Sequence, residues 1–473
     1  MTQLNVDICV IGGGSGGLSV AAGASQMGAT VALVESGKMG GDCLNYGCVP
    51  SKSLLTAAKV AHEISTSSLF GIEEKKPVVD FAKVMAHVHG VIEKISVHDS
   101  VERFTKLGVK VIQAPAQFKD ANTVVAGDTT ITARRFVIAT GSSPAVPPIP
   151  GIDKVNFYTN ETIFDIQHKP EHLIVIGGGP IGCELAQAFL LLGTKVTVLE
   201  AFNILPKDEK DLVAMLRQQL IDDGLVIKEG VKITDIREEN KKIKVTLTKE
   251  GREEVITGTD LLVAAGRRAN VKKLNLEAAG VRYSAKGIEV NKRLQTSNKR
   301  VYAVGDVAGS FQFTHIAGYH AGIAVRNILF RLPANVDYKA VPWVTYTDPE
   351  LAHVGMSTED ALKYDPKAKI VYANFADNDR AQAEHKTLGK IKVVTDKKGK
   401  ILGATILGPH AGELLLPWVI AIQEGKSIRS MTSIIAPYPT LSEISKRVAG
   451  EYYKPLIFSD RVKKIVRFLR YFG

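Results

Sequence analysis

A glycine-rich turn that is flanked by apolar segments and followed by an acid constrains the fold of this chain most strongly. Residues 6–11 form an apolar run typical of a buried strand, and Gly12-Gly-Gly14-Ser-Gly-Gly17 follows at once. A helical run over 18–27 and a second apolar run over 30–34 come next, and the latter ends at Glu35. Strand, Gly-x-Gly-x-x-Gly, helix, strand and acid in this order predict a βαβ unit with a tight turn.

The glycines and the acid of such a unit each have a physical reason. Gly12 suits the tight turn, Gly14 lets a pyrophosphate approach the backbone, and Gly17 allows the helix and strand to pack closely. The helix N-terminus offers unpaired amides and the positive end of a dipole to phosphate groups. The carboxylate of Glu35 can accept hydrogen bonds from both hydroxyls of a ribose. The unit therefore predicts a dinucleotide site.

The same unit recurs near the middle of the chain. A strand over 173–176 precedes Gly177-Gly-Gly179-Pro-Ile-Gly182, and a helix over 183–192 leads to a strand over 195–199 that ends at Glu200. In both copies the acid stands 23 positions after the first glycine of the turn. Two such units predict two different bound dinucleotides, and the alternative is that one copy is a degenerate structural repeat.

The first unit leads into a loop that holds two of the four cysteines of the chain. Cys43 and Cys48 are flanked by Gly41 and Gly47, and Lys52 follows one helical turn after the second cysteine. On a helix, residues five apart differ by about 140° and a rise of roughly 7.5 Å, which lies near the upper limit for a disulfide. The ammonium of Lys52 can favour a thiolate or bind a cofactor edge. We predict a reversible dithiol/disulfide, and the alternative is two buried cysteines that lie near each other by chance.

Length and composition restrict the class of protein. With 473 residues the chain exceeds one core, and its 45% hydrophobic and 23% charged residues are typical of a globular protein. No apolar run reaches the length of a membrane span, and the early strand pattern leaves no room for a signal peptide, so a cytosolic protein is expected. The net charge of +11 is spread along the chain without a recognition motif, which argues against nucleic acid. No histidine and carboxylate spacing predicts a metal site.

Several shorter patterns lie outside the two units. A buried strand over 136–139 ends at Thr140-Gly141, and the prolines of residues 144–150 suggest a linker. A strand near 261–265 ends at Gly266, and another over 301–305 ends at Asp306, where an α/β sheet binds ligands. Thr314-His315 opens a helix, and residues 341–450 combine strands and helices in an α+β pattern.

These motifs together carry a family resemblance. To about residue 450 the chain resembles the class I pyridine nucleotide–disulfide oxidoreductases, which include dihydrolipoamide dehydrogenase, glutathione reductase and mercuric reductase. The resemblance implies an α/β fold with two Rossmann-like dinucleotide-binding domains, for FAD and NAD, and an α+β C-terminal dimerisation domain. The domains expected are FAD-binding over 1–150, NAD-binding over 151–270, the central part of the FAD domain over 271–340, dimerisation over 341–450, and a tail helix over 451–473.

The resemblance also implies cofactor sites and a homodimer, in which the C-terminal domain of one chain completes the active site of the other. FAD is expected on Gly12, Gly14, Gly17, Glu35, Gly41, Lys52, Thr140, Gly141, Asp306, Thr314 and His315. The nicotinamide cofactor is expected on Gly177, Gly179, Gly182, Glu200 and Gly266. The carboxylate of Glu200 accepts from the 2′-hydroxyl of NAD and repels a 2′-phosphate, so NADH is favoured over NADPH.

The family mechanism implies roles for the cysteine loop. Hydride passes from the nicotinamide to the flavin, and electrons then pass to the Cys43–Cys48 disulfide. Cys48 is expected against the flavin and Cys43 toward the substrate, with Lys52 and Glu184 as an ion pair beside the flavin. The helix that begins at Thr314 is expected to stabilise negative charge on the reduced flavin ring.

Three departures from the family pattern bear on the substrate. Disulfide-reducing members carry His-Pro-x-x-x-Glu near the C-terminus, whereas this chain has Tyr438-Pro-Thr-Leu-Ser-Glu443, and a free tyrosine titrates near pH 10. Mercuric reductases place a tyrosine in this region but add a C-terminal cysteine pair, and no cysteine follows Cys183 here. Asp42 replaces a more usual threonine, and its carboxylate is expected to raise the pKa of Cys43 or to bind a cation.

We therefore expect an enzyme, a dimeric FAD protein that uses NADH to reduce a small-molecule acceptor which the sequence does not name. Chemistry like that of dihydrolipoamide dehydrogenase or mercuric reductase stays open, as does a metal-ion or quinone reductase without a thiol base. A redox sensor that NADH reduces without turnover is the alternative from another class.

The tail is expected to form a helix over 461–472, capped by Ser459 or Asp460. Its apolar residues fall within an arc of roughly 160°, and most of its cations fall opposite. Two alternatives stay open: a helix that lies in an anionic membrane surface, and one whose apolar face packs on the protein or across the dimer.

Overall fold

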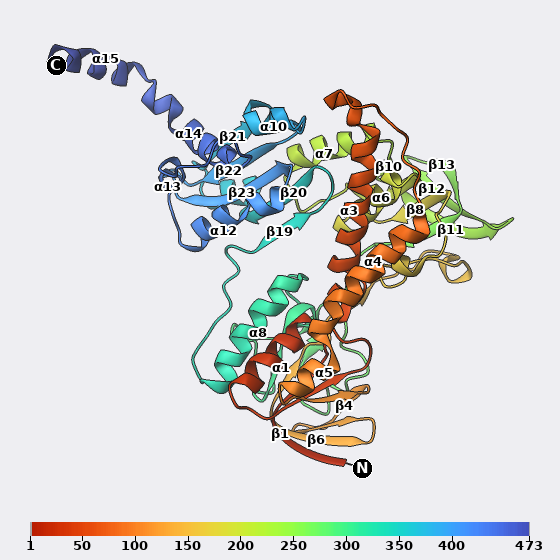
Figure 1. Cartoon of the computed structure of the whole chain (residues 1–473). Coiled ribbons are helices and arrows are strands. Elements are labelled where there is room, and N and C mark those ends of the chain that lie inside the picture. Colours follow the sequence, from red (N-terminus) through yellow and green to blue (C-terminus); the bar gives the residue numbers. More distant parts are fainter. Residues whose placement is uncertain (1, 473) are drawn as a thin grey trace. The chain divides into compact units, whose positions relative to one another are not determined.

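The computed structural model describes residues 2–472 and divides into two compact units (Figure 1). The first unit comprises Met1–Ile64, Lys76–Ala201 and Ile227–Asp337. The second comprises Ser65–Lys75, Phe202–Val226 and Tyr338–Gly473. The chain has an α/β architecture. The finer domain boundaries expected from the sequence stay a prediction.

The main sheet of the first unit runs in the order β3-β2-β1-β6-β5-β4, and β18 pairs with β6. Its strands are β1 (Thr2–Ile11), β2 (Val31–Glu35), β3 (Lys110–Gln113), β4 (Ala116–Asp120), β5 (Thr123–Ala126), β6 (Thr129–Ile138) and β18 (Val301–Ala303). β1 is parallel to both β2 and β6, so the carboxyl ends of these strands share one edge. That edge is where the first glycine turn begins.

Alternation along β1 explains the two cores of this sheet. Ile8 and Val10 are buried with residues of the helices α1 (Ser15–Gln26) and α8 (Thr314–Leu329), which lie side by side in Figure 1. Cys9 and Ile11 point to the other face, into a cluster that includes Phe118 of β4. Successive strand residues face opposite sides of a sheet, so both faces of β1 are apolar because both are covered.

The second βαβ unit forms a sheet in the order β10-β9-β8-β14. Its elements are β8 (His172–Ile176), α6 (Pro180–Leu191), β9 (Lys195–Glu200), β10 (Val226–Glu229) and β14 (Asp260–Val263). An antiparallel sheet of β11 (Lys232–Glu239), β12 (Lys242–Lys249) and β13 (Arg252–Gly258) shares a core with it. Residues 226–263 thus hold five successive strands, β10 to β14.

Short elements complete the first unit. Its remaining strands are β7 (Ser142–Pro144), which pairs with β15 (Arg267–Ala269), and β16 (Tyr283–Ser284), which pairs with β17 (Gly287–Ile288). Its remaining helices are α2 (Gly41–Asn45), α3 (Cys48–Ser65), α4 (Phe81–Ser96), η2 (Val97–Asp99), α5 (Val101–Lys106), η3 (Ile152–Lys154), η4 (Ile163–Asp165) and η5 (Gly305–Ala308).

The second unit is built on an antiparallel sheet in the order β19-β20-β23-β22-β21. The strands are β19 (Pro342–Thr345), β20 (Glu350–Gly355), β21 (Lys369–Asn374), β22 (Lys390–Thr395) and β23 (Ile401–Gly408). The helices are η1 (Ser67–Phe70), α7 (Lys210–Asp222), α9 (Thr358–Tyr364), η6 (Phe375–Asp377), α10 (Asp379–Ala383), α11 (Ala411–Leu414), α12 (Leu416–Gln423), α13 (Arg429–Thr432), α14 (Glu443–Ile457), α15 (Asp460–Leu469) and η7 (Arg470–Phe472). Trp418 of α12 is fully buried in the core.

Helix α14 packs on this sheet through Ile444, Val448 and Ala449, and α15 reaches away from it, as the blue end of the chain in Figure 1 shows. The tail helix predicted over 461–472 is present as α15 followed by η7, and Ser459 rather than Asp460 caps it by accepting from the amide of Val462. No residue of either element is buried, so the apolar face does not pack on the chain itself. Packing across the dimer, the other form of that alternative, stays a prediction, as does the membrane surface. None of the helices within residues 2–472 is long and apolar enough to cross a membrane.

Candidate functional site

The first glycine turn leaves no space for side chains at two of its positions. Gly12 has φ +109°, and a Cβ there would lie 2.4 Å from the carbonyl oxygen of Ala139. A Cβ on Gly17 would lie 1.8 Å from the oxygen of Gly12, because the helix rises directly against the strand end. Helix α1 begins after Gly14 without a side-chain cap and without an acid in its first turn. Its amides are therefore suited to the phosphates of a dinucleotide, which is the fit expected for FAD.

Glu35 stands at the carboxyl end of β2 and faces this turn. Its two carboxylate oxygens accept hydrogen bonds from the amides of Gly13 and Gly37. The acid thus lies beside the glycine turn, where a ribose that follows the pyrophosphate would lie.

The cysteine loop begins directly against the same turn. The amide of Gly40 donates to the carbonyl of Gly13 at 2.9 Å, and Gly14 and Gly40 form an isolated bridge. A Cβ on Gly41, which has φ +61°, would lie 2.6 Å from the Cα of Gly14. The first dinucleotide turn and the dithiol loop are therefore one packed assembly.

The second glycine turn repeats the backbone geometry of the first. Gly177 has φ +112°, and a Cβ there would lie 2.4 Å from the carbonyl oxygen of Ala264. A Cβ on Gly182 would lie 2.0 Å from the oxygen of Gly177, and Glu200 accepts from the amide of Gly178 at 2.6 Å. Gly179 differs from Gly14 because a Cβ added to it would meet nothing within 4 Å. Helix α6 likewise begins without a side-chain cap.

The two cysteines lie at neighbouring helix starts, Cys43 within α2 and Cys48 at the start of α3. Both are free thiols here, and they are hydrogen-bonded to each other. Cys48 Sγ also lies 3.6 Å from Thr314 Oγ1 at the start of α8. The predicted approach of the two side chains is thus realised by a bend between two helices rather than along one.

The pair divides its proton unequally. The hydrogen bond from Cys43 lowers the pKa of Cys48 to about 6, helped by the Thr314 hydroxyl and the charge of Lys52, although burial opposes the shift. The pKa of Cys43 is raised, first by its hydrogen bond to Cys48 and then by burial. Cys48 is therefore the thiol that ionises first, and Cys43 keeps the proton.

Lys52 lies one turn along α3 from Cys48, and its Nζ is 2.7 Å from Glu184 Oε2. Glu184 belongs to α6, the helix that follows the second glycine turn, and it is almost fully buried. A charge pair between these helices places a cation near the thiolate and links the two βαβ units.

Asp306 follows β18 at the carboxyl edge of the main sheet and accepts a hydrogen bond from Ser142 Oγ. Burial is the main cause that raises the pKa of its carboxyl group, and the charge of Arg267 opposes this. Gly141 has φ +67° and Gly266 has φ +122°, so both turns adopt a backbone that favours glycine. Thr140 Oγ1 donates to the carbonyl of Asn270.

The start of α8 carries the two remaining predicted cofactor residues. The helix begins at Thr314 without a side-chain cap or an acid in its first turn. His315 stacks on Phe313, with ring centroids 5.2 Å apart. An uncapped helix start next to Cys48 places a positive dipole end at the dithiol.

Sequence reasoning missed the residues that hold the cysteine loop in place. Arg267 Nη2 lies 3.2 Å from Asp42 Oδ1 and donates to the carbonyl of Ser142. Asn160 Nδ2 donates to the same Asp42 oxygen and to the carbonyl of Tyr46. Asp42 therefore pairs with a side chain of the chain itself, Arg267, and the pKa of Cys43 is raised mainly by Cys48 and by burial rather than by Asp42. The only local signal was the position of Arg267 directly after Gly266.

In the second unit, Tyr438 and Glu443 do not pair. Tyr438 Oη donates to Asp379 Oδ2 at 2.9 Å, and this bond raises the pKa of the tyrosine. Glu443 is a weak acceptor for the amide of Thr440 at 3.4 Å. Asp379, which begins α10, was not predicted, and nothing near it in the sequence marks it as a partner of Tyr438.

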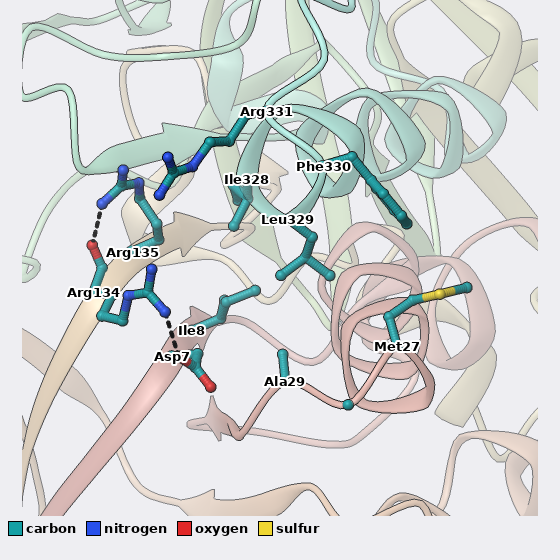
Figure 2. Close-up of a pocket in the computed structure, with 11 residues that line it drawn as sticks. Asp7, Ile8, Met27, Ala29, Arg134, Arg135, Ile328, Leu329, Phe330 and Arg331 are labelled. Carbon is teal, nitrogen blue, oxygen red and sulfur yellow. Dashed lines mark hydrogen bonds and ion pairs between the residues drawn. The ribbon is translucent and has the colours of Figure 1, made fainter.

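A separate cavity of about 360 Å³ lies at the far end of α1 from the glycine turn (Figure 2). Its lining is Asp7, Ile8, Met27, Gly28, Ala29, Arg134, Arg135, Ile328, Leu329, Phe330 and Arg331. Arg134 pairs with Asp7 at 3.0 Å, and Arg135 donates to the carbonyl of Arg134. This cavity is separate from the dithiol site, because neither Cys43 nor Cys48 lines it. Within residues 2–472, no cluster of three or more His, Cys, Asp or Glu side chains is arranged to hold a metal ion.

Comparison with known protein families covers nearly the whole chain. Residues 6–321 match the model of the pyridine nucleotide-disulphide oxidoreductases, and residues 341–449 match the dimerisation domain of the same family. The dimerisation domain supports a homodimer.

Relatives of known function include enzymes of two kinds. A mercuric reductase of Staphylococcus aureus is 35% identical over 453 residues, which are 95% of this chain and 82% of that protein. A dihydrolipoyl dehydrogenase of Geobacillus stearothermophilus is 35% identical over 462 residues, which are 94% of this chain and 96% of that protein. The Cu(II) complex of the HOCl-induced flavoprotein disulfide reductase RclA from Escherichia coli has a TM-score of 0.86 at 27% identity and covers 94% of this chain and 99% of that one. The chain therefore belongs to the pyridine nucleotide-disulphide oxidoreductase family, as a flavoprotein disulfide reductase related to mercuric reductase and dihydrolipoyl dehydrogenase.

Proposed function

We propose that this protein is a cytosolic, homodimeric NADH-dependent reductase that passes electrons through Cys43 and Cys48 to a soft metal ion. The observation that carries the proposal is the hydrogen-bonded thiol pair, in which Cys48 has a pKa of about 6 beside Thr314 and the Lys52–Glu184 ion pair. A low-pKa thiolate next to a protonated thiol is suited to two-electron redox chemistry.

The residues of the first unit fit FAD, which would supply a two-electron carrier between the nicotinamide and the dithiol. The pyrophosphate of FAD would lie on Gly12, Gly14 and Gly17, and Glu35 would bind its ribose. Asp306 would bind a hydroxyl in the rest of the FAD molecule. Gly41, Thr140, Gly141 and His315 would line the same cofactor. Gly177, Gly179, Gly182, Glu200 and Gly266 would hold the nicotinamide cofactor.

The side chains of the site control charge and protons. Lys52 and the uncapped start of α8 stabilise the thiolate of Cys48, and the Thr314 hydroxyl lies within reach of its sulfur. Reduction of the disulfide takes two electrons and, because Cys48 stays a thiolate near neutral pH, one proton, which Cys43 holds because its pKa is raised. Transfer of both electrons to Hg(II) would give Hg(0), or to two Cu(II) ions two Cu(I), with release of the Cys43 proton and re-formation of the disulfide.

The choice of NADH rests on the second acid. Glu200 ends β9 beside the second glycine turn, and Ala201, Phe202 and Asn203 follow it, so no cation next to it in the sequence is available for a 2′-phosphate. A carboxylate in this position favours the free 2′-hydroxyl of NADH.

A metal acceptor is favoured over a disulfide by the state of Tyr438. Its hydrogen bond to Asp379 raises a pKa that is already near 10, so the tyrosine stays protonated and cannot serve as the base that a dithiol substrate requires. Thiolates are preferred ligands of soft metal ions. Mercuric reductases are among the relatives, and the related RclA forms a Cu(II) complex.

The test is an acceptor screen that follows NADH absorbance with Hg(II), Cu(II), lipoamide and a soluble quinone. We expect steady turnover with a metal ion that both Cys43→Ser and Cys48→Ser abolish, whereas Cys9→Ala, at a buried cysteine of the sheet core, retains it. Turnover with quinone that survives Cys43→Ser would refute the dithiol route. If NADH reduced the protein only stoichiometrically and no acceptor gave steady NADH consumption, the protein would instead be a sensor.

Replacing the tyrosine tests the acceptor directly. Tyr438→His should raise lipoamide reduction about 10²–10⁴-fold, because a positioned base contributes that much. Tyr438→Phe is the matched control, since it removes the bond to Asp379 without adding a base. High lipoamide activity in the unmodified enzyme would contradict the assignment.

A further inference from the structure

The C-terminal segment beyond the dimerisation domain exposes a run of large apolar side chains that the proposed function does not explain. The family match ends at residue 449, and α14 continues to Ile457 before α15 begins at Asp460. Every residue from 454 to 472 is exposed except Ser459 and Val462, which are half-buried. A helix with a broad apolar face normally buries that face against its own fold, and this one does not.

The exposed residues are large and lie on one side. Ile465, Val466, Phe468, Leu469 and Phe472 share one arc of the helix, and Phe468 and Phe472 are 61% and 74% exposed. Their rings contact each other at 5.1 Å between centroids, so the last turn keeps the same apolar side. Leu456, Ile457 and Phe458 add further exposed apolar side chains just before the helix.

Cations surround this apolar arc. Lys463, Lys464, Arg467 and Arg470 occupy the opposite side, and Arg461 lies near the edge of the arc. The helix itself holds one carboxylate, Asp460, which pairs with Lys463 at 3.3 Å. Long basic side chains can bury their stems along an apolar surface while the charged ends stay in water. Five cations and one carboxylate leave residues 460–472 strongly positive, so an anionic surface is the electrostatic complement of this helix.

We propose that residues 456–472 form a peripheral anchor that lies in the surface of an anionic phospholipid bilayer. The apolar arc would enter the boundary between headgroups and acyl chains, and the cations would contact the lipid phosphates. The anchor is independent of the identity of the electron acceptor, and it would hold the reductase at the bilayer surface without a membrane span.

The experiment is co-sedimentation of the FAD-loaded dimer with two kinds of vesicle. One is phosphatidylcholine alone, and the other contains about one third phosphatidylglycerol. We expect binding to the anionic vesicles only, and a marked loss of it in about 0.5 M salt. Phe468→Ser/Leu469→Ser should abolish binding, whereas Tyr471→Ser, on the polar side, should leave it intact. Lys463→Gln/Lys464→Gln should lower the partition coefficient about 20-fold or more, at roughly fivefold for each charge.

A truncation to residues 1–458 separates the anchor from a structural role. We expect it to stay dimeric, to keep its thermal midpoint and its NADH turnover with a soluble acceptor, and to lose vesicle binding. Failure of the full chain to bind anionic vesicles would overturn the proposal. Dissociation or destabilisation of the truncated dimer would overturn it as well, since the apolar arc would then belong to the interface between copies.

Discussion

The two glycine turns share one backbone and differ in what covers them. In both, the first glycine lies with positive φ against a neighbouring strand end, and the acid accepts from the second glycine's amide. The first turn is covered by Gly40 and Gly41 of the cysteine loop. The second is open at Gly179. A turn enclosed by the chain suits a resident cofactor, and an open turn suits one that exchanges in each catalytic cycle.

The largest expected effect comes from a glycine pair that separates the two turns. Gly41→Ala places a Cβ 2.6 Å from the Cα of Gly14 and strains a backbone with φ +61°, so the protein should purify without FAD. Gly179→Ala meets no atom within 4 Å and should keep FAD while raising KM for NADH. Absorbance at 450 nm and steady-state kinetics measure the two outcomes. Equal loss of FAD in both variants would break the distinction.

Titration of the thiol that lies beside the first turn sharpens the comparison. Because Cys48 has a pKa of about 6, alkylation of the reduced enzyme by iodoacetamide should be constant above that pH and fall as pH drops through 6. At pH 7 the thiolate population should exceed that of a free cysteine, with a pKa near 8.5, by about 30-fold. Mass spectrometry identifies the modified residue.

The matched variant for this titration is Thr314→Val. It removes a hydrogen bond that lowers the pKa of Cys48, so the alkylation midpoint should move upward. A midpoint between 8 and 9 in the unmodified enzyme would show that the thiolate is not stabilised.

The smallest expected effect comes from replacing Glu35 and Glu200, the acids beside the two glycine turns. Glu200→Ala should lower kcat/KM for NADH about 10- to 150-fold, because a hydrogen bond to a charged group contributes roughly 1.5–3 kcal/mol. The same change should leave kcat/KM for NADPH unaffected or improved. Glu35→Ala should instead weaken FAD retention without changing the choice of nicotinamide cofactor. If NADPH and NADH served the unmodified enzyme equally, the role of Glu200 would be refuted.

The glycine turns could be predicted because their information is local. Gly12 and Gly177 are each followed by a helix and an acid within 23 positions, and the backbone geometry requires glycine there. The cap at Ser459 was equally local, since its hydroxyl serves an amide three residues later. Family, fold and enzyme class followed from these motifs together with the cysteine loop.

The interactions that hold the cysteine loop in place could not be predicted, because the residues that form them are far apart in sequence. Asp42 meets Arg267 and Asn160, and no periodicity or spacing joins such positions. The partner of Tyr438 escaped for the same reason, because Asp379 is 59 residues away. Exposure of the tail was also hidden, since an amphipathic pattern is the same whether the apolar face packs on protein or not.

The long separations around Cys48 also bear on the order of events during synthesis. Thr314 stands 266 positions after Cys48, and Glu184 stands 132 positions after Lys52. A ribosome releases the cysteines long before either partner, and contacts of high sequence separation form late in folding. The nascent chain therefore carries two ordinary thiols of low reactivity, and the reactive thiolate emerges only when nearly the whole first unit has been made.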